Sequence, residues 1–185
     1  MAAAESNMLA IGTKAPYFQL YDTITKDMVS IEDIRSNKAT VVMFICNHCP
    51  YVHHVMGKLL ETANEYMEKG ISFVAISSND VENYPQDHPD LMKMIADMCH
   101  FPFPYLYDET QIVAKEYKAA CTPDFYVFDK NLLLVYRGRF DETRPQMNVE
   151  PTGKDLKTAL DAILENKEIP SKQFPSIGCS IKWKK

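Results

Sequence analysis

The feature that most constrains this sequence is a strand–helix–strand pattern between residues 39 and 77. Residues 39–45 (ATVVMFI) and 71–77 (ISFVAIS) are rich in β-branched and aromatic residues without polar alternation, which predicts strands covered on both faces. Between them, apolar residues recur at intervals of one and three from Val52 to Met67, which predicts one long helix that ends at Lys69-Gly70. The unit has the length of a right-handed crossover between two parallel strands.

Shorter patterns predict the remaining elements and an α/β fold. We expect an edge strand at 15–20, where a proline is tolerated, with a hairpin partner at 28–31. The other expected elements are helices at 89–99, 109–118 and 154–166, and strands at 124–128 and 132–136. Together these elements predict a three-layer α/β/α sandwich with a mixed central sheet.

The two ends of the chain differ from residues 12–168, which we expect to form one domain. Residues 1–11 have the composition of a flexible lead-in, and residues 169–185 form an irregular tail. The tail contains the apolar residues Ile177, Ile181 and Trp183, which are not normally left in water. We therefore expect the tail to be docked on the domain.

Composition excludes several classes of protein. With 185 residues, 46% of them hydrophobic, the chain can bury a core without disulfides or metals. The net charge of −5 argues against a nucleic-acid partner, and the longest apolar runs are too short for a membrane span. The N-terminal segment lacks the basic and apolar regions of a secretory signal. We therefore expect a cytoplasmic protein in which paired cysteines are catalytic or metal-binding.

The segment Cys46-Asn47-His48-Cys49-Pro50 carries the chemistry, because it falls at the joint between the central strand and the long helix. A thiol at a helix start faces unpaired N–H groups and the positive end of the helix dipole, which lower its pKa. We expect Cys46 to be exposed there and to attack a substrate disulfide. Cys49 would then resolve the mixed disulfide, and His48 would stabilise the Cys46 thiolate.

Two other interpretations of these cysteines stay open beside the redox dithiol. A Cys-x-x-Cys pair is also half of a zinc site, and Cys49 with His53 would share one helix face; no distant second ligand pair is visible in the sequence. Alternatively, the cysteines are inert core residues. The strand-then-helix context favours the redox dithiol, and we expect no metal and no cofactor.

Other residues are accessory candidates. Thr122-Pro123 stands immediately before a predicted strand, and Cys121 precedes it. Cys179 in the tail is either a further resolving thiol or a packing residue. Arg139 either belongs to a solvated loop or contacts an anionic substrate or peroxide. Cys99 lies on the apolar side of a predicted helix, so we expect it in the core.

Four segments together carry a family resemblance. They are residues 12–18 (GTKAPYF), 46–50 (CNHCP), 121–125 (CTPDF) and 136–141 (YRGRFD). With them the chain resembles the thioredoxin-like redoxins, the superfamily of alkyl hydroperoxide reductases and thiol-specific antioxidants. Residues 175–183 (PSIGCSIKW) resemble the tail of a small subgroup of thioredoxin-like proteins with the Cys-Asn-His-Cys-Pro motif.

This resemblance implies a thioredoxin-like fold with an N-terminal hairpin and an insertion at about residues 80–107. It implies Cys46 and Cys49 as the redox pair and Pro123 as a cis proline that faces them. The backbone of Thr122 would then offer its N–H and C=O groups to a peptide substrate.

Some residues depart from the family pattern. If Cys49 occupies the place of the peroxidatic cysteine of peroxiredoxins, Val42 and Cys46 replace the Pro and Thr that activate peroxide there. Thioredoxins bury an acid beneath the dithiol as a proton acceptor, and residues 39–45 contain none.

The sequence therefore predicts a thiol–disulfide oxidoreductase that acts on a disulfide-containing protein or small molecule. No glycine-rich nucleotide loop is visible, so electrons would come from a separate thiol reductase. The alternatives are a peroxiredoxin-like thiol peroxidase with antioxidant activity and a redox-responsive binding module.

Overall fold

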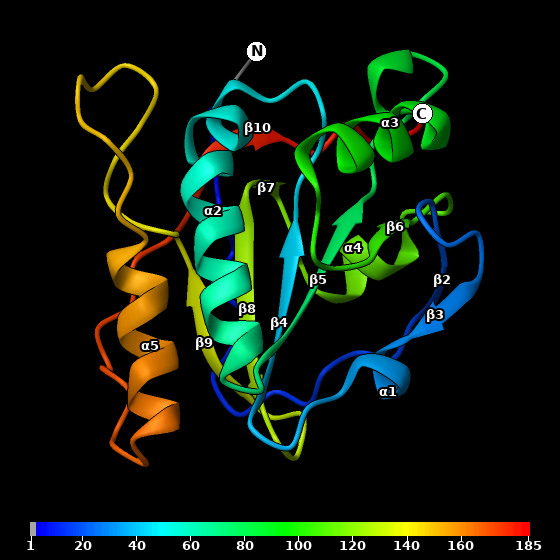
Figure 1. Cartoon of the computed structure of the whole chain (residues 1–185). Helices are drawn as coiled ribbons and strands as arrows, with labels where there is room; N and C mark the ends of the chain where they lie inside the picture. The colour runs from blue at the N-terminus through cyan, green and yellow to red at the C-terminus, as the bar shows by residue number, and fades with distance from the viewer. Residues whose placement is uncertain (1–2) are drawn as a thin grey trace.

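The computed structural model describes residues 3–185, which form a mixed seven-stranded sheet with helices on both faces (Figure 1). The strand order is β3-β2-β6-β5-β4-β8-β9, and a separate three-stranded sheet has the order β1-β10-β7. The elements are β1 (Ala3–Glu5), β2 (Gln19–Asp22), β3 (Met28–Ser30), α1 (Ile31–Ile34), β4 (Ala39–Phe44), α2 (Pro50–Glu68), β5 (Ser72–Ser77), the 3-10 turn η1 (Pro85–Asp87), α3 (Pro89–Cys99), β6 (Tyr105–Tyr107), α4 (Ile112–Glu116), β7 (Cys121–Thr122), β8 (Asp124–Asp129), β9 (Leu134–Gly138), α5 (Lys154–Leu164) and β10 (Ile177–Ser180).

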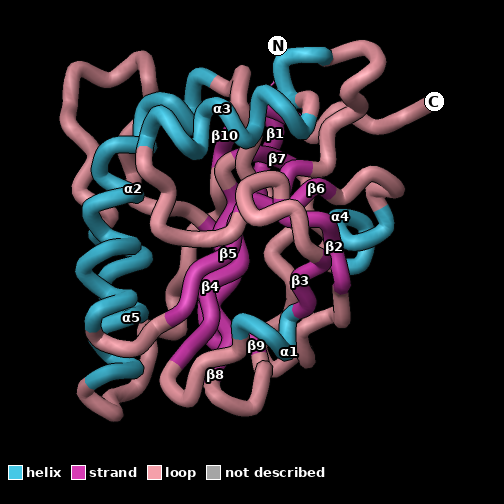
Figure 2. Tube along the Cα trace, turned by 45° about the vertical axis from the view of Figure 1, so that its right-hand side comes forward, coloured by secondary structure: helices cyan, strands magenta, loops and turns pink. Residues whose placement is uncertain are grey.

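The predicted strand–helix–strand unit is confirmed as β4-α2-β5. Strand β4 lies in the middle of the sheet, parallel to β5 and antiparallel to β8, and every one of its residues is buried. Its side chains alternate between two cores. Val41 and Met43 belong to the core that includes residues of α2 and α5, whereas Val42 and Phe44 belong to the core that includes residues of α1 and α4. Figure 2 shows these helices around the sheet. This arrangement confirms the α/β/α layers.

The N-terminal hairpin β2-β3 is also confirmed, with one correction. Strand β2 pairs with β6 as well as with β3, so β3 is the edge strand and β2 is not. Pro16 precedes the strand, which begins at Gln19, and therefore takes no hydrogen-bonding position from it.

The expectations for the two chain ends need correction. The lead-in contains β1, the tail contains β10, and the two strands pair with each other. Residues 1–2 of the expected lead-in lie outside the described part. The tail is docked, because Cys179 and Ile181 are buried, although Trp183 keeps 40% of its surface exposed. Strands of three and four residues are too short for a periodic pattern, and their partners are remote in sequence.

Strand β10 lies across the end of the sheet at which α2 begins, beside β7 (Figure 1). Cys179 pairs with Thr122, and Ser180 pairs with Cys121. This placement brings the tail directly to the cysteine segment between β4 and α2.

Candidate active site

The Cys46–Cys49 segment connects β4 to α2, as predicted, but the helix starts later than expected. Pro50 is the first residue of α2, and Cys49 is its N-cap. Cys46 therefore precedes the helix and lies outside its first turn. The stabilisation of a thiolate by a helix N-terminus applies to Cys49 and not to Cys46.

Both thiols are buried, which corrects the expectation of an exposed Cys46. Cys46 has 2% of its surface exposed, and Cys49 has none. The Thr122-Pro123 peptide bond is cis, as the resemblance implied, and Thr122 covers the pair. The Cys46 Sγ lies 3.4 Å from the Thr122 hydroxyl, and the neutral Cys49 thiol donates to the Thr122 carbonyl at 3.2 Å.

The backbone edge that was expected to receive a peptide substrate is occupied. Thr122 is paired in an antiparallel ladder with Cys179 of the same chain. A glycine precedes Cys179, and a Cβ on Gly178 would lie 1.9 Å from the Thr122 carbonyl oxygen. Only a residue without a side chain permits this approach. The tail is therefore built into the site.

A buried acid that the sequence analysis missed faces the motif. Asp87, in η1, has no exposed surface and accepts a hydrogen bond from the backbone N–H of Asn47 at 2.7 Å. Its other oxygen lies 2.6 Å from His48 Nδ1 and 2.8 Å from the Asn79 amide nitrogen. The His48 ring stacks on Tyr84, with centroids 5.5 Å apart. The insertion thus holds His48 in place beside the dithiol.

No local pattern could have revealed Asp87. It lies 40 residues beyond Asn47, in a proline-containing loop where an aspartate is ordinary. The His48 ring, which was expected to act on Cys46, therefore also contacts the Asp87 carboxylate, 2.6 Å from its Nδ1.

The surroundings of the two thiols favour ionisation of Cys49 over that of Cys46. The main cause that lowers the pKa of Cys49 to about 5 is hydrogen bonding from Cys46. Cys179 and the Val52 backbone N–H also lower this pKa, whereas burial raises it. The same hydrogen bond to Cys49 raises the pKa of Cys46 well above its ordinary value, with contributions from burial and the charge of Asp87. These directions favour Cys49 over Cys46 as the thiolate, and the assignment of Cys46 as the attacking thiol stays a prediction.

The other cysteines have distinct surroundings. Cys179 is buried against the pair, and burial together with its hydrogen bond to Cys49 raises its pKa to about 12. Cys121 is buried with its thiol 3.9 Å from the Ser176 carbonyl oxygen, and burial raises its pKa. Cys99 is exposed at the end of α3, so the expectation that it belongs to the core is wrong.

A second buried acid, Asp124, follows the cis proline directly. Strand β4 holds no acid, as expected, but Asp124 lies opposite its last residue, Phe44, in the neighbouring strand β8. Tyr126 donates a hydrogen bond to it at 2.9 Å, and burial raises the pKa of Asp124 to about 7. The negative charge of Asp124 contributes to the raised pKa of the nearby Cys121 thiol.

Arg139 does not contact the thiols. Its Nε lies 2.6 Å from Asp155, and its guanidinium lies 4.4 Å from the centre of the Phe174 ring. It lines a small pocket of about 40 Å³ beside Pro123, together with Tyr51. An anion in this pocket would compete with Asp155 for the arginine.

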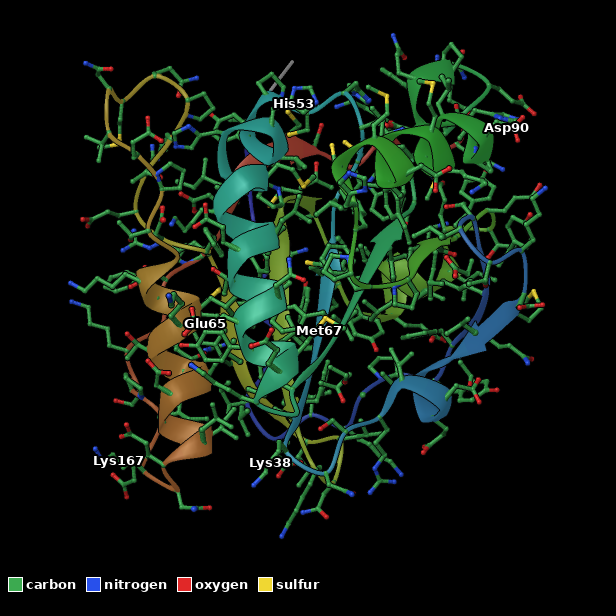
Figure 3. The ribbon with its side chains drawn as sticks, in the orientation of Figure 1. Lys38, His53, Glu65, Met67, Asp90 and Lys167 are labelled. Atoms are coloured by element: carbon green, nitrogen blue, oxygen red, sulfur yellow. The ribbon has the colours of Figure 1, made fainter. Side chains whose placement is uncertain are left out.

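The zinc alternative finds little support in the side chains near Cys49. His53 is exposed at the start of α2 (Figure 3). Its ring contacts the Asn47 carbonyl oxygen. Within residues 3–185, one group has ligand atoms close enough for a metal ion, namely Cys46, His48 and Asp87. In this group, His48 Nδ1 and the Asp87 carboxylate are in direct contact with each other, 2.6 Å apart.

A model of the AhpC/TSA family matches residues 11–137, which is more than half of the chain. The chain belongs to the AhpC/TSA family. Two solved structures resemble this family member along its whole length. An uncharacterised conserved protein from Geobacillus kaustophilus is 58% identical, with a TM-score of 0.98 over 100% of this chain and 97% of that one. A hypothetical protein from Sinorhizobium meliloti is 39% identical, with a TM-score of 0.94 over 97% and 98%.

A more distant structure confirms the fold class. A putative thioredoxin from Neisseria meningitidis is 23% identical and has a TM-score of 0.60, over 83% of this chain and 92% of that one. No curated protein matches the chain. Family and fold together support a redox function of the thioredoxin-like kind. Among the described residues, no helix combines the length and apolar character of a membrane span.

Proposed function

We propose that this AhpC/TSA family member is a thiol–disulfide oxidoreductase that uses the Cys46/Cys49 dithiol. The observation that carries the proposal is the joint placement of both thiols under the cis Thr122-Pro123 peptide, with Cys49 at the N-cap of α2. A thiolate that is stable near neutral pH, next to a second thiol, is the minimum requirement for two-step disulfide exchange.

The electrostatics favour reversed roles for the two cysteines. The Cys49 thiolate attacks one sulfur of a substrate disulfide, forms a mixed disulfide and releases one substrate thiolate. The Cys46 thiol then loses its proton and attacks the Cys49 sulfur, which releases the second substrate thiolate and leaves a Cys46–Cys49 disulfide. Two electrons have passed to the substrate. A separate thiol reductase would return them.

The burial of both thiols limits which substrates reach them. Neither cysteine exposes more than 2% of its surface to solvent. The Thr122 edge is already paired, so an extended peptide cannot add there without displacing β10. This favours a small disulfide, or a disulfide at a flexible protein surface, that enters after a local movement of the cover. The exchange of disulfides between these cysteines and the substrate requires no bound cofactor.

The proposal is tested by comparing two rates on the purified protein. We expect reduction of oxidised glutathione, or of a small aromatic disulfide, to exceed hydrogen peroxide consumption, because the groups that activate peroxide in peroxiredoxins are replaced by Val42 and Cys46. Cys49→Ser should abolish disulfide reduction, whereas the exposed Cys99→Ser should retain it. A peroxide rate far above that of an ordinary thiol would favour the peroxidase instead.

The reversed roles have their own measurement. The ultraviolet absorbance of thiolates should reveal an ionisation with a pKa of about 5 in the wild type, and Cys49→Ser should remove it. If the low ionisation persists in Cys49→Ser, Cys46 is the thiolate and the roles are those first expected from the sequence.

A further inference from the structure

Cys179 is positioned by the backbone of the tail to meet the dithiol. Strand β10 pairs with β7 so that Cys179 lies opposite Thr122, the residue that covers both active-site thiols. Gly178 permits the two backbones to approach closely, because a Cβ there would strike the Thr122 carbonyl. The position of Cys179 is therefore specified by the fold.

The tail is fixed on both sides of Cys179. Ahead of it, the Ser176 backbone N–H donates to the Ser6 hydroxyl at 2.8 Å. Beyond it, the Lys182 backbone N–H donates to the Asn79 side chain at 2.8 Å, and its carbonyl accepts from Gln111 at 2.7 Å. These buried hydrogen bonds hold the thiol at one place beside α2, which gives it a high effective concentration there.

The three thiols gather around Thr122. Cys46 Sγ lies 3.4 Å from the Thr122 hydroxyl, Cys49 Sγ lies 3.2 Å from the Thr122 carbonyl oxygen, and Cys179 is the partner of Thr122 in the ladder of β7 and β10. The pKa of Cys49 responds to both of the other thiols, Cys46 and Cys179. All three belong to one buried cluster on the α2 side of the sheet. Cys121, although next to Thr122 in sequence, points to the Ser176 carbonyl instead. Cys179 is thus the thiol that the tail contributes to the buried cluster of the dithiol.

We propose that Cys179 is a third redox thiol, which forms a disulfide with Cys49 in exchange with the Cys46–Cys49 disulfide. The inference rests on the proposed dithiol function. In the exchange, the Cys179 thiol loses its proton and its sulfur attacks Cys49. The Cys49–Cys46 bond breaks, and Cys46 leaves as a thiolate that takes up the proton. The step is redox-neutral, so it needs no further oxidant.

This exchange gives the centre two resolving thiols. After Cys49 has attacked a substrate, either neighbour can displace the substrate thiolate, and the oxidised protein distributes its disulfide between Cys46–Cys49 and Cys49–Cys179. In the form with the Cys49–Cys179 disulfide, Cys46 is a free thiol and the protein is still oxidised by two electrons. It also links α2 covalently to the tail.

The test uses Cys46→Ser, which cannot form the first disulfide, in a Cys99→Ser background that prevents dimers through the exposed thiol. The reduced variant is treated with one equivalent of diamide, its free thiols are counted, and its disulfides are mapped by non-reducing digestion. We expect the loss of one pair of thiols and a dominant Cys49–Cys179 peptide. A further Cys179→Ser change should remove this bond, whereas a matched Cys121→Ser change should leave it intact.

Two results overturn the inference: an oxidised Cys46→Ser variant without an internal disulfide, and one that joins Cys49 to Cys121. Circular dichroism checks that the variant is folded. If it is not, mapping of the wild type in a glutathione redox buffer decides, and absence of any Cys49–Cys179 peptide refutes the exchange. Disulfide reductase turnover of the wild type tests the proposed function separately, so either idea can fail while the other stands.

Discussion

Gly178 offers the clearest test of how the tail is attached. An alanine Cβ there would lie 1.9 Å from the Thr122 carbonyl oxygen and 2.7 Å from its carbon. Both are backbone atoms in a paired strand, so no side-chain rotation relieves the clash, and β10 must move away from β7. Overpacking of this kind costs about 1–3 kcal/mol. For a chain of this size, the Tm of Gly178→Ala should fall by roughly 2–12 °C.

Gly57 provides a matched control of opposite sign. It lies exposed within α2, and a Cβ there meets nothing within 4 Å. Gly57→Ala should therefore stabilise the protein by about 0.5–1 kcal/mol, because alanine loses less backbone entropy in a helix. Thermal denaturation by circular dichroism measures both variants under the same conditions. A Gly178→Ala protein that is as stable as the wild type would refute the close packing of β10 on Thr122.

Three further variants test the electrostatics and the helix packing. Asp87→Asn removes a charge that helps to raise the pKa of Cys46, so Cys46 should react several-fold faster with iodoacetamide at pH 8; an unchanged rate contradicts this. Burial raises the pKa of Asp124 from 3.8 to about 7, so the native state binds the proton more tightly and the wild type loses stability as the pH rises from about 4 to 7. In urea denaturation, the free energy of unfolding of Asp124→Asn relative to that of the wild type should therefore increase across that pH window, by up to about 4 kcal/mol. A difference between the two proteins that does not change with pH would contradict this prediction. Tyr66→Phe deletes the 2.6 Å hydrogen bond from α2 to Asp161 in α5, and its free energy of unfolding should fall by about 1 kcal/mol in the same assay. An unchanged free energy of unfolding would mean that this hydrogen bond does not stabilise the packing of α2 on α5.

The elements that the sequence predicted correctly share a physical property. Strand β4, helix α2 and strand β5 are long enough for burial to impose a pattern on consecutive residues, and their mutual contacts are nearly local. Strands β1 and β10 have three and four residues and are stabilised by each other across the length of the chain. No periodicity exists in such segments, so the lead-in and the tail were predicted as irregular.

The candidate site divides in the same way. Cys46, Cys49 and the cis Pro123 were recognisable from their position at element boundaries and from the family resemblance. Asp87 and Asp124 were missed, because an aspartate becomes informative only when its neighbours in space are known. The proposed roles of the two thiols depend on their neighbours in space and on where α2 begins. Because α2 begins at Pro50, its N-terminus lies at Cys49 and not at Cys46.

The small sheet β1-β10-β7 also bears on the order in which the protein folds. It joins residues as far apart as Ala3 and Cys179, a separation of 176 residues (179 − 3). Closing a loop costs entropy that grows with the logarithm of its length, by roughly 2 kcal/mol for each tenfold increase. We therefore expect the β4-α2-β5 unit to form first and β10 to reach Thr122 late. Until it does, Cys49 is uncovered, so refolding under oxidising conditions should trap thiol pairings that the finished protein keeps apart.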